Sequence, residues 1–508
     1  MPRSNNLFSE LSSQWTDKDK AAIETSARKL YRYHDILATT SRFANALSAR
    51  GVKPGDRVAA QVEKSPEALF LFLACARAGA AYLPLNTAYT EAELHYFLCD
   101  AEPSVFVCRP GMSEAAELCE KAKVPTLLTL GTDADGTLPA LAAGQLDVFE
   151  DVPRSAGDLA AVLYTSGTTG RSKGAMLSHG NLTSNAQALV EAWRFTSNDV
   201  LLHALPIFHT HGLFVATNVV LMAGASMLFL PKYDSNEIIR LLPRATTMMG
   251  VPTFYVRLLD DVRLTHEAAA HMRLFVSGSA PLLPDTHSGF LERTGHSILE
   301  RYGMTETGMN TSNPYEGDRV PGTVGLPLPG IEVRIANPET GEIIGQEEIG
   351  MIEVRGPNVF QGYWRMSEKT KAEFRDGGFF ITGDLGKIDA RGYVHIVGRG
   401  KDLIISGGFN VYPKEVESEI DALPGVAESA VIGVPHPDLG EGVMAVVVLS
   451  KDSELQEKDV IDALKHRLAN YKLPKRVFFV DALPRNTMGK VQKNLLRDAY
   501  GELFRGKS

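Results

Sequence analysis

The chain has 508 residues, of which 44% are hydrophobic and 22% are charged. At a prior of about 150 residues per domain, this length predicts roughly three domain-sized units, each able to bury a core. The composition is close to that of globular proteins and excludes disorder over most of the chain. The formal net charge of −9 disfavours a general role in binding nucleic acid, so we expect no nucleic-acid partner.

The cysteines and the two ends of the chain indicate in which cellular compartment the protein is located. The four cysteines show no CxxC spacing and lie in apolar or helical contexts, so we expect buried, reduced thiols. Residues 1–14 lack the apolar segment of a secretory signal, and the last residues do not match the peroxisomal tripeptide. These features favour a cytoplasmic location. The cysteines are Cys75, Cys99, Cys108 and Cys119.

Apolar strand-like runs alternate with helical patterns over the first 320 residues. This alternation predicts βαβ units and parallel sheets. The expected strands are 57–62, 80–85, 105–108 and 126–130, and the expected helices between them are 66–78 and 91–99.

Residues 159–164 read as a buried strand that leads into the loop 165–174, which holds three glycines, five hydroxyls, an Arg and a Lys. Glycines let main-chain N–H groups turn toward an anion, so such a loop suits a polyphosphate. It is not a Walker A motif, because Ser172 stands where that spacing requires Gly. A solvated Gly/Ser/Thr loop and a P-loop nucleotidase are the alternatives at this point.

The segment 212–230 has 19 residues without a charge, a length typical of a transmembrane helix. Gly224 divides it, however, and residues 225–230 read as a strand closed by Pro231. We therefore expect a buried helix, turn and strand, and no membrane partner. A membrane-associated lipid carrier built around this segment is the alternative from a different functional class.

The pattern changes after about residue 320, where short strands bounded by Gly and Pro predict a small antiparallel or barrel-like unit. A further unit begins near residue 403. The junction 398–402 interleaves glycines with charges, so it predicts either a flexible hinge or a hairpin turn. The expected elements are strands 332–335, 350–355 and 392–397, then helix 413–422 and strands 429–434 and 443–449.

Six segments resemble, in order, the motifs of the adenylate-forming superfamily, which includes acyl-CoA synthetases, firefly luciferase and nonribosomal-peptide adenylation domains. Ser172 replaces the usual Pro of the first motif. The contexts 205–213, 249–259 and 300–310 are most similar to malonyl-CoA synthetases. The six segments are 164–181, 277–282, 301–307, 382–386, 398–404 and 484–490.

The resemblance implies an α/β fold. The N-terminal domain, 1–398, would hold two doubly wound α/β subdomains and a small β-barrel-like unit; 399–402 would be a hinge, and 403–508 a small mobile α+β domain. It also implies two half-reactions. A carboxylate attacks the α-phosphate of Mg-ATP to give acyl-AMP and pyrophosphate, and CoA then displaces AMP. Malonate is the expected acid; methylmalonate, acetate or a coumarate-type acid is the alternative.

The resemblance also assigns the ATP site. The phosphates would lie on Thr165, Ser166, Gly167, Thr168, Thr169, Gly170 and Lys173. Glu306 would bind Mg²⁺, assisted by Thr165, because this cation prefers oxygen ligands. Tyr302 would stack on adenine, with Gly278 and Ala280 near the ring, and Asp384 and Arg399 would reach the ribose. The other expected members of the ATP site are Arg301, Gly303, Met304 and Thr305.

Lys490 is the expected catalytic residue for adenylation, because a mobile ammonium can bridge the carboxylate and the α-phosphate. Its neighbours Lys493 and Arg497 are expected to be solvated. Acetylation of Lys490 would remove its charge, so an acetyltransferase and a deacetylase are possible partners. Asp402 is the expected hinge, and Gly407 and Gly408 would let the pantetheine arm of CoA pass close to the main chain.

The acyl pocket is the least determined part of the site. His209 and His211 could share a face in a strand, but no carboxylate or Cys follows closely, so a structural metal is disfavoured. The resemblance instead implies that His209 is a catalytic residue, which lines the acyl pocket and the tunnel for the CoA thiol. Thr210 and Met309 are expected to limit branching near C2. Arg257 or Arg301 would bind the distal carboxylate of malonate; either could instead snorkel or form an interdomain ion pair.

Overall fold

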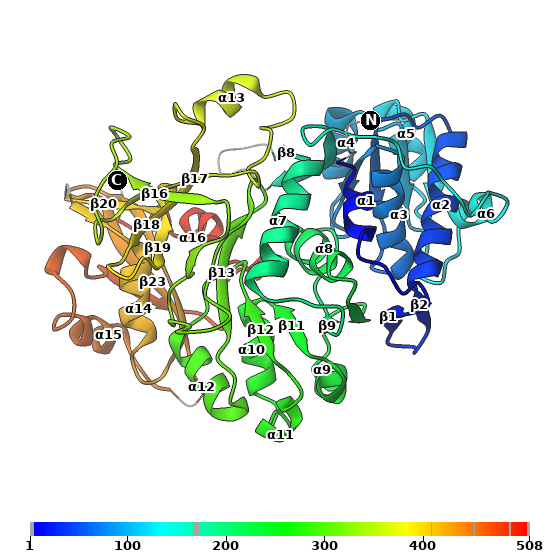
Figure 1. Cartoon of the computed structure of the whole chain (residues 1–508). Helices are drawn as coiled ribbons and strands as arrows, with labels where there is room; N and C mark the ends of the chain where they lie inside the picture. The colour runs from blue at the N-terminus through cyan, green and yellow to red at the C-terminus, as the bar shows by residue number, and fades with distance from the viewer. Residues whose placement is uncertain (1–4, 166–171, 408, 452, 487–488, 505–508) are drawn as a thin grey trace. The chain divides into compact units, whose positions relative to one another are not determined.

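The chain divides into two compact units, Met1–Glu332 with Val354–Phe380, and Val333–Glu353 with Ile381–Ser508. The hinge expected at 399–402 lies inside the second unit, and its role remains a prediction. The computed structural model, drawn in Figure 1, describes residues 5–165, 172–407, 409–451, 453–486 and 489–504.

The first unit contains a six-stranded sheet in the order β6-β5-β3-β4-β7-β8, parallel except for β8. Its expected strands and helices are confirmed to within three residues. The elements are β3 (Arg57–Gln61), α3 (Pro66–Arg77), β4 (Ala81–Pro84), α4 (Glu91–Ala101), β5 (Val105–Cys108), α5 (Ala115–Ala122), β6 (Thr126–Thr129), α6 (Thr137–Ala143), β7 (Leu159–Thr165) and β8 (Lys173–Ser178).

Local chemistry fixes where these helices begin. The side chain of Ser65 accepts a hydrogen bond from the main-chain N–H of Ala68, and Pro66 occupies the first turn of α3. Thr90 and Glu93 form a capping box at α4. Both signals are sequence-local, which is why the helix positions could be predicted.

The first unit also contains a nine-stranded sheet in the order β15-β14-β13-β12-β11-β9-β10-β1-β2, whose six central strands, from β13 to β1, are parallel. In Figure 1 the green strands β9, β11 and β12 lie side by side, with α10 beside them. The strands are β1 (Ala21–Thr25), β2 (Leu30–Arg32), β9 (Val200–His203), β10 (Ser226–Phe229), β11 (Thr247–Gly250), β12 (Leu274–Ser277), β13 (Leu299–Met304), β14 (Gly308–Ser312) and β15 (Leu326–Pro327). The helices are α1 (Leu7–Ser12), α2 (Tyr33–Ala49), α7 (His179–Ala192), α8 (Thr217–Met222), α9 (Ser235–Leu241), α10 (Pro252–Leu259), α11 (His266–Ala269) and α12 (Pro284–Thr294).

The uncharged segment 212–230 folds as a helix, a turn and a strand, as expected. A π-helical stretch, η1 (His211–Ala216), continues into α8, and Gly224 turns the chain with a φ of +61° before β10. Within the part of the chain that the structure describes, every helix is too short or too polar to cross a bilayer.

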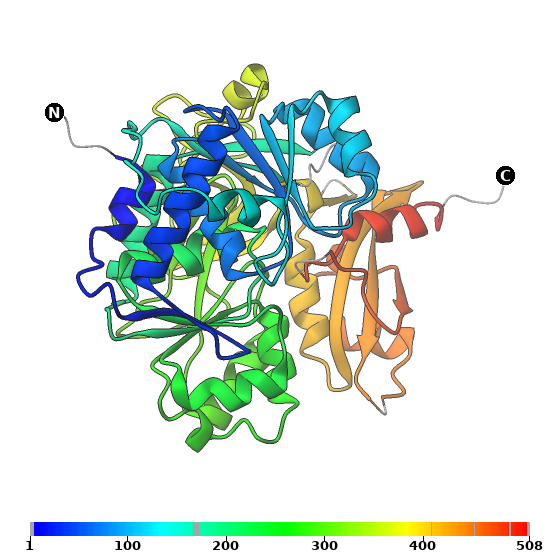
Figure 2. The same ribbon diagram turned by 90° about the vertical axis from the view of Figure 1, so that its right-hand side faces the viewer.

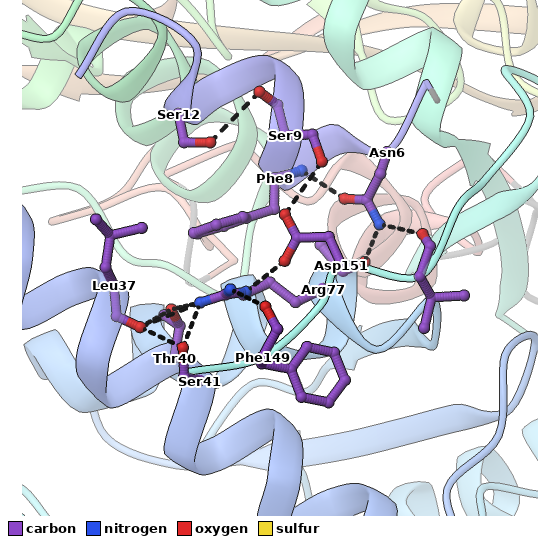
Figure 3. A network of polar contacts seen from close by, with 12 residues as sticks. Asn6, Phe8, Ser9, Ser12, Leu37, Thr40, Ser41, Arg77, Phe149 and Asp151 are labelled. Carbon is purple, nitrogen blue, oxygen red and sulfur yellow. Dashed lines mark hydrogen bonds and ion pairs between the residues drawn. The ribbon is translucent and has the colours of Figure 1, made fainter. Parts of the chain in front are cut away.

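Arg77 is a buried cation at the end of α3 that ties three segments together (Figure 3). Its Nε lies 2.6 Å from Oδ1 of Asp151, and its two terminal nitrogens donate to the main-chain oxygens of Leu37 and Phe149. It also lies over the ring of Phe8 in α1, 4.5 Å from the centroid. Because a buried charge is tolerated only when paired and hydrogen-bonded, this network explains an arginine inside an otherwise apolar helix.

The second unit contains two sheets, in the orders β16-β17-β18-β19 and β21-β20-β23-β22, with β24 also on β23. In Figure 2 the gold helix α14 runs along the orange strands β22 and β23. The elements are β16 (Glu332–Ala336), β17 (Gly350–Arg355), β18 (Phe380–Ile388), β19 (Val394–Arg399), β20 (Ile404–Ser406), β21 (Phe409–Val411), α14 (Pro413–Asp421), β22 (Val426–His436), β23 (Gly440–Leu449), α15 (Glu457–Leu464), β24 (Arg476–Phe479) and α16 (Lys493–Tyr500). A short helix, α13 (Ser367–Ala372), lies in the first unit.

One expectation about the cysteines is wrong. Cys75, Cys108 and Cys119 are buried thiols, but Cys99 is exposed on α4. It lies one turn from His95, on the part of the helix that does not face the apolar core. All four are free, so the expectation of reduced thiols holds.

Candidate active site

The residues at both ends of the loop 165–174, which we call the phosphate loop, are hydrogen-bonded to α4. Thr165 and Lys173 pair across β7 and β8. The hydroxyl of Tyr96 donates to the main-chain oxygen of Ser172 at 2.8 Å, and the hydroxyl of Tyr164 donates to Asp100. The loop therefore starts and ends on a fixed base. The expectations for Ser166, Gly167, Thr168, Thr169 and Gly170 fall outside the described residues.

Lys173 and Glu306 lie close together, linked by two residues that sequence analysis missed. Nζ of Lys173 lies 3.3 Å from Oε1 of Glu373 and 4.0 Å from the centre of the Tyr363 ring. The Tyr363 hydroxyl lies 2.8 Å from Oε2 of Glu373 and 3.0 Å from Oε1 of Glu306. A single Tyr and a single Glu with no distinctive spacing gave no signal in the sequence.

The residues around Glu306 fit a magnesium ion that arrives on a nucleotide. Glu306 is only 6% exposed, and the hydroxyl of Tyr363 lies 3.0 Å from its Oε1. The role expected for Thr165 at this ion remains a prediction. Among the described residues, no three His, Cys, Asp or Glu side chains form a metal-binding group. One carboxylate is typical of Mg²⁺, which keeps water and phosphate oxygens as its other ligands.

The ends of β12 and β13 bring together the residues expected around the nucleotide base. Carboxyl ends of parallel strands meet at one sheet edge, and binding residues collect there. Tyr302 is 7% exposed in β13. At Gly303 a Cβ would lie 2.0 Å from the main-chain oxygen of Gly308, so only glycine fits this hairpin. Ala280, Met304 and Thr305 are half-buried at the same edge.

Arg301 is the most unusual cation of the site. It is 3% exposed, and within the described residues its Nε and Nη2 find no hydrogen-bond acceptor. Burial lowers its pKa. The hydroxyls of Ser277, on β12, and Thr210 are also buried without a partner among these residues. Buried polar atoms are normally hydrogen-bonded, so the unsatisfied nitrogens of Arg301 indicate a binding site.

His211 lies beside this arginine and is neutral. Burial, and then the charge of Arg301, hold the pKa of His211 well below its usual value. Its Nδ1 lies 3.3 Å from the hydroxyl of Ser279, whose φ is +73°. A non-glycine residue in this conformation is uncommon and occurs often at functional sites.

Arg257 has a different environment. It is exposed on α10, with its guanidinium 5.6 Å from the ring centre of Tyr233. Arg257 is therefore solvated and packed on an aromatic face, whereas Arg301 is desolvated.

The residues expected at the acyl pocket surround the start of η1. Thr210 is 3% and Met309 2% exposed, and His209 is half-buried. Sequence analysis missed His203, whose Nε2 lies 3.0 Å from the main-chain oxygen of Gly212. π-helical turns occur frequently at functional sites, and His203 fixes this one.

The second unit holds the remaining expected residues. Nε of Arg399 lies 2.8 Å from Oδ1 of Asp384, so the two ribose-binding candidates meet across β18 and β19. The main-chain N–H of Lys490 donates to Oδ1 of Asn486 at 2.9 Å, and its side chain is exposed. Gly407 has a φ of +60°, while Gly408 lies outside the described residues.

Two expectations near Lys490 are wrong. Lys493 and Arg497 are not simply solvated, because each pairs with a carboxylate inside the second unit. Nζ of Lys493 lies 2.5 Å from Oε1 of Glu417, which is 6% exposed. Nη2 of Arg497 lies 2.6 Å from Oδ1 of the hinge candidate Asp402. Helix α16 packs on β22, which brings both cations within reach.

Comparison with known families identifies the chain. Residues 12–364 match the family model of AMP-binding enzymes, and residues 415–490 match that of the AMP-binding enzyme C-terminal domain. The chain belongs to the AMP-binding enzyme family. These two models match segments in both compact units, so the predicted membership of the adenylate-forming superfamily and the predicted α/β fold class are confirmed.

The most informative relatives of this AMP-binding enzyme are one solved structure and two curated proteins. ATP-bound MatB from Rhodopseudomonas palustris is 62% identical, with a TM-score of 0.97, over 99% of this chain and 100% of that chain. A malonate–CoA ligase of Arabidopsis thaliana is 33% identical over 97% of this chain and 90% of its own length. A feruloyl-CoA synthase of an Amycolatopsis species is 37% identical over 92% and 94%. The chain is an acid–thiol ligase, an enzyme class that uses ATP and CoA.

Proposed function

We propose that this AMP-binding enzyme is an ATP-dependent malonate–CoA ligase, which forms malonyl-AMP and pyrophosphate and then malonyl-CoA and AMP. The observation that carries the proposal is the buried Arg301, two of whose nitrogens have no hydrogen-bond partner among the described residues. Malonate brings a second carboxylate into the acyl pocket, and a desolvated carboxylate needs a cation with matching hydrogen bonds. The similarity to a malonate–CoA ligase supports the same acid.

The proposed roles follow the chemistry of the first half-reaction. Two anions must meet, so the site supplies positive charge and fixed donors. Lys173 and the phosphate loop bind the β- and γ-phosphates, and Lys490 bridges the attacking carboxylate and the α-phosphate. Glu306 and Thr165 would hold a magnesium ion, which would supply positive charge to the phosphates. The base lies against Tyr302, Gly278 and Ala280, and the ribose on Asp384 and Arg399.

In the second half-reaction, the thiol of CoA attacks the acyl carbon and AMP leaves with the bonding electrons. His209 lines the path of the thiol, and the pantetheine arm passes Gly407 and Gly408. Rotation of the C-terminal domain about Asp402 would bring Lys490 to the site for the first half-reaction and Gly407 and Gly408 for the second. Acetylation of Lys490 would remove the ammonium needed in the first half-reaction, which makes this lysine the proposed off-switch.

Arginine variants test the choice of acid. Arg301→Ala should raise the KM for malonate about 10²–10³-fold, the cost of removing the partner of a buried charge, and should leave the KM for ATP nearly unchanged. Acetate has no distal carboxylate, so its activation should survive in this variant. Arg257→Ala is the matched control and should change neither KM. Equal loss of malonate and acetate activation in Arg301→Ala would contradict the role of Arg301.

The alternative is a ligase for another short-chain or aryl acid, favoured by the similarity to a feruloyl-CoA synthase. Carboxylate-dependent exchange of pyrophosphate into ATP, measured over malonate, methylmalonate, acetate and a coumarate-type acid, decides between them. Because Thr210 and Met309 are buried at the pocket, methylmalonate should be activated less well than malonate. Preference for an aryl acid would overturn the proposal.

A further inference from the structure

Tyr363 places one proton between two carboxylates. Its hydroxyl lies 2.8 Å from Oε2 of Glu373 and 3.0 Å from Oε1 of Glu306. Burial, followed by the charges and hydrogen bonds of both carboxylates, raises the pKa of Tyr363, so the phenol keeps its proton. One O–H group donates fully to only one acceptor at a time. The proton therefore has two alternative acceptors.

Glu373 is also the anion that faces Lys173. Its Oε1 lies 3.3 Å from Nζ of Lys173, and both side chains are less than one-fifth exposed. Lys369, one turn earlier in the chain, contacts the same oxygen at 2.7 Å. Burial alone would raise the pKa of Glu373, but hydrogen bonds from Lys369 and Tyr363 and the charge of Lys173 lower it. Glu373 is thus ionised, and it presents to Lys173 the charge that a phosphate would present.

A bound triphosphate changes this balance. Its oxygens are stronger acceptors for Lys173 than one carboxylate, because they carry more charge. When Lys173 turns to the phosphate, Glu373 loses a cation in a partly desolvated place. A buried carboxylate without that cation is stabilised by any donor that remains, and the Tyr363 hydroxyl is within hydrogen-bond distance.

We propose that Tyr363 and Glu373 are positioning residues that couple the phosphate lysine Lys173 to the cation ligand Glu306. In the nucleotide-free enzyme, Glu373 holds Lys173. When Mg-ATP binds, Lys173 moves to the phosphates, and the Tyr363 hydroxyl donates to Glu373 instead of to Oε1 of Glu306, which then accepts the cation. This inference rests on the proposed function only for placing phosphate at Lys173 and the cation at Glu306.

A purely structural role for Tyr363 is the alternative. Its ring packs on Phe360, with centroids 4.9 Å apart, and its main-chain N–H donates to the hydroxyl of Thr370. In that case substitution at Tyr363 would perturb the site without any dependence on Glu373. The two accounts therefore differ in how substitutions at these positions combine.

The first test removes the competing anion. Glu373→Gln keeps the size and the acceptor oxygen of the side chain but no longer holds Lys173 by charge. The Kd of Mg-ATP, measured by calorimetry on the full chain without any carboxylic acid, should fall about 3- to 10-fold, the scale of one partly buried ion pair. Glu368→Gln is the matched control: it makes the same change on an exposed position of α13 and should leave the Kd unchanged.

The second test removes the proton. In Tyr363→Phe, Glu373 has no hydroxyl donor to replace Lys173, so it should retain the lysine and raise the Kd of Mg-ATP about 10-fold. In the Glu373→Gln background, Tyr363→Phe should no longer raise the Kd, so the double variant should bind Mg-ATP as tightly as Glu373→Gln alone. A structural defect would not be repaired in this way, because removing a charge at Glu373 cannot rebuild the packing around the ring.

The outcomes separate this inference from the proposed function. A raised or unchanged Kd in Glu373→Gln would overturn the coupling, and so would a double variant that binds about 10-fold more weakly than Glu373→Gln alone. Either result would leave malonate-dependent pyrophosphate exchange by the wild type intact. Conversely, wild-type enzyme that binds Mg-ATP but shows no malonate-dependent exchange would overturn the choice of acid and leave the coupling standing. Wild-type enzyme that fails to bind Mg-ATP would overturn both.

Discussion

Gly278 lies directly against the guanidinium of Arg301. A Cβ atom at Gly278 would lie 2.4 Å from Cζ of Arg301, far closer than two non-bonded carbons approach. The glycine follows β12, and the arginine lies on the adjacent strand β13. The absence of a side chain at Gly278 therefore sets where the buried cation lies.

Gly278→Ala should displace the guanidinium while the fold remains, because the atoms in the way are the end of a flexible side chain. We expect the KM for malonate to rise about 10-fold or more, since a misplaced cation loses its hydrogen-bond geometry. Gly289→Ala is the control: among the described residues, its Cβ would meet only Leu259, at 3.8 Å, and the helix should gain slightly in stability. Equal kinetics for the two variants would show that Gly278 does not position Arg301.

Glu300 is expected to make stability depend on pH. It is 7% exposed, and burial raises its pKa to about 8, despite hydrogen bonds from the main-chain N–H groups of Gly322 and Leu282. The folded state therefore keeps a proton that the unfolded chain releases near the ordinary glutamate pKa of 4.5. The stabilisation is full below that value and is lost as pH rises toward 8, at up to about 1.4 kcal/mol per pH unit.

Glu300→Gln should flatten this dependence, because the amide does not ionise. Urea unfolding at several pH values between 5 and 8.5 measures the slope of the free energy of unfolding. Glu292→Gln, at an exposed position of α12, serves as the control and should keep the wild-type slope. If the two variants show the same slope, Glu300 does not carry the proton.

Lys490→Ala should slow malonyl-AMP formation about 10²–10⁴-fold, the scale of losing one well-placed electrostatic group in the transition state. Stability should hardly change, because the side chain is exposed. Supplying purified malonyl-AMP and CoA isolates the second half-reaction, which should proceed normally. If it is slowed as much as adenylation, Lys490 serves both steps, and acetylation would not act as a selective off-switch.

Asp402→Pro should slow thioester formation more than adenylation, because proline fixes φ near −65° and restricts rotation at the proposed hinge. The substitution also removes the ion pair with Arg497, at 2.6 Å. Arg497→Met removes the same ion pair without restricting the main chain, so it isolates that effect. Separate rapid-quench measurements of the two half-reactions decide the matter, and equal slowing of both in Asp402→Pro would contradict the hinge assignment.

Local signals in the sequence determined most of the secondary structure. The strands of the six-stranded sheet, the capped start of α3 at Ser65 and the break at Gly224 depend on nearest neighbours in the chain, so patterning and capping located them. The family motifs likewise singled out Lys173, Glu306, Asp384 and Lys490 as candidate site residues, whose roles remain predictions. Their spacing is a property of the chain itself, and it sufficed for the fold class and the enzyme class.

Only the tertiary structure distinguished Arg301 from Arg257, because burial is a sum over distant segments that a single sequence does not display. The same limit hid Tyr363 and Glu373, which reach Lys173 from about 200 residues away. For the same reason, the expectations for Cys99, Lys493 and Arg497 were wrong. The exposure or pairing of these residues depends on which helix face packs against which sheet. Residue type and spacing determined which chemistry the chain can offer, whereas long-range packing decided which charged groups lose their water and therefore need a partner.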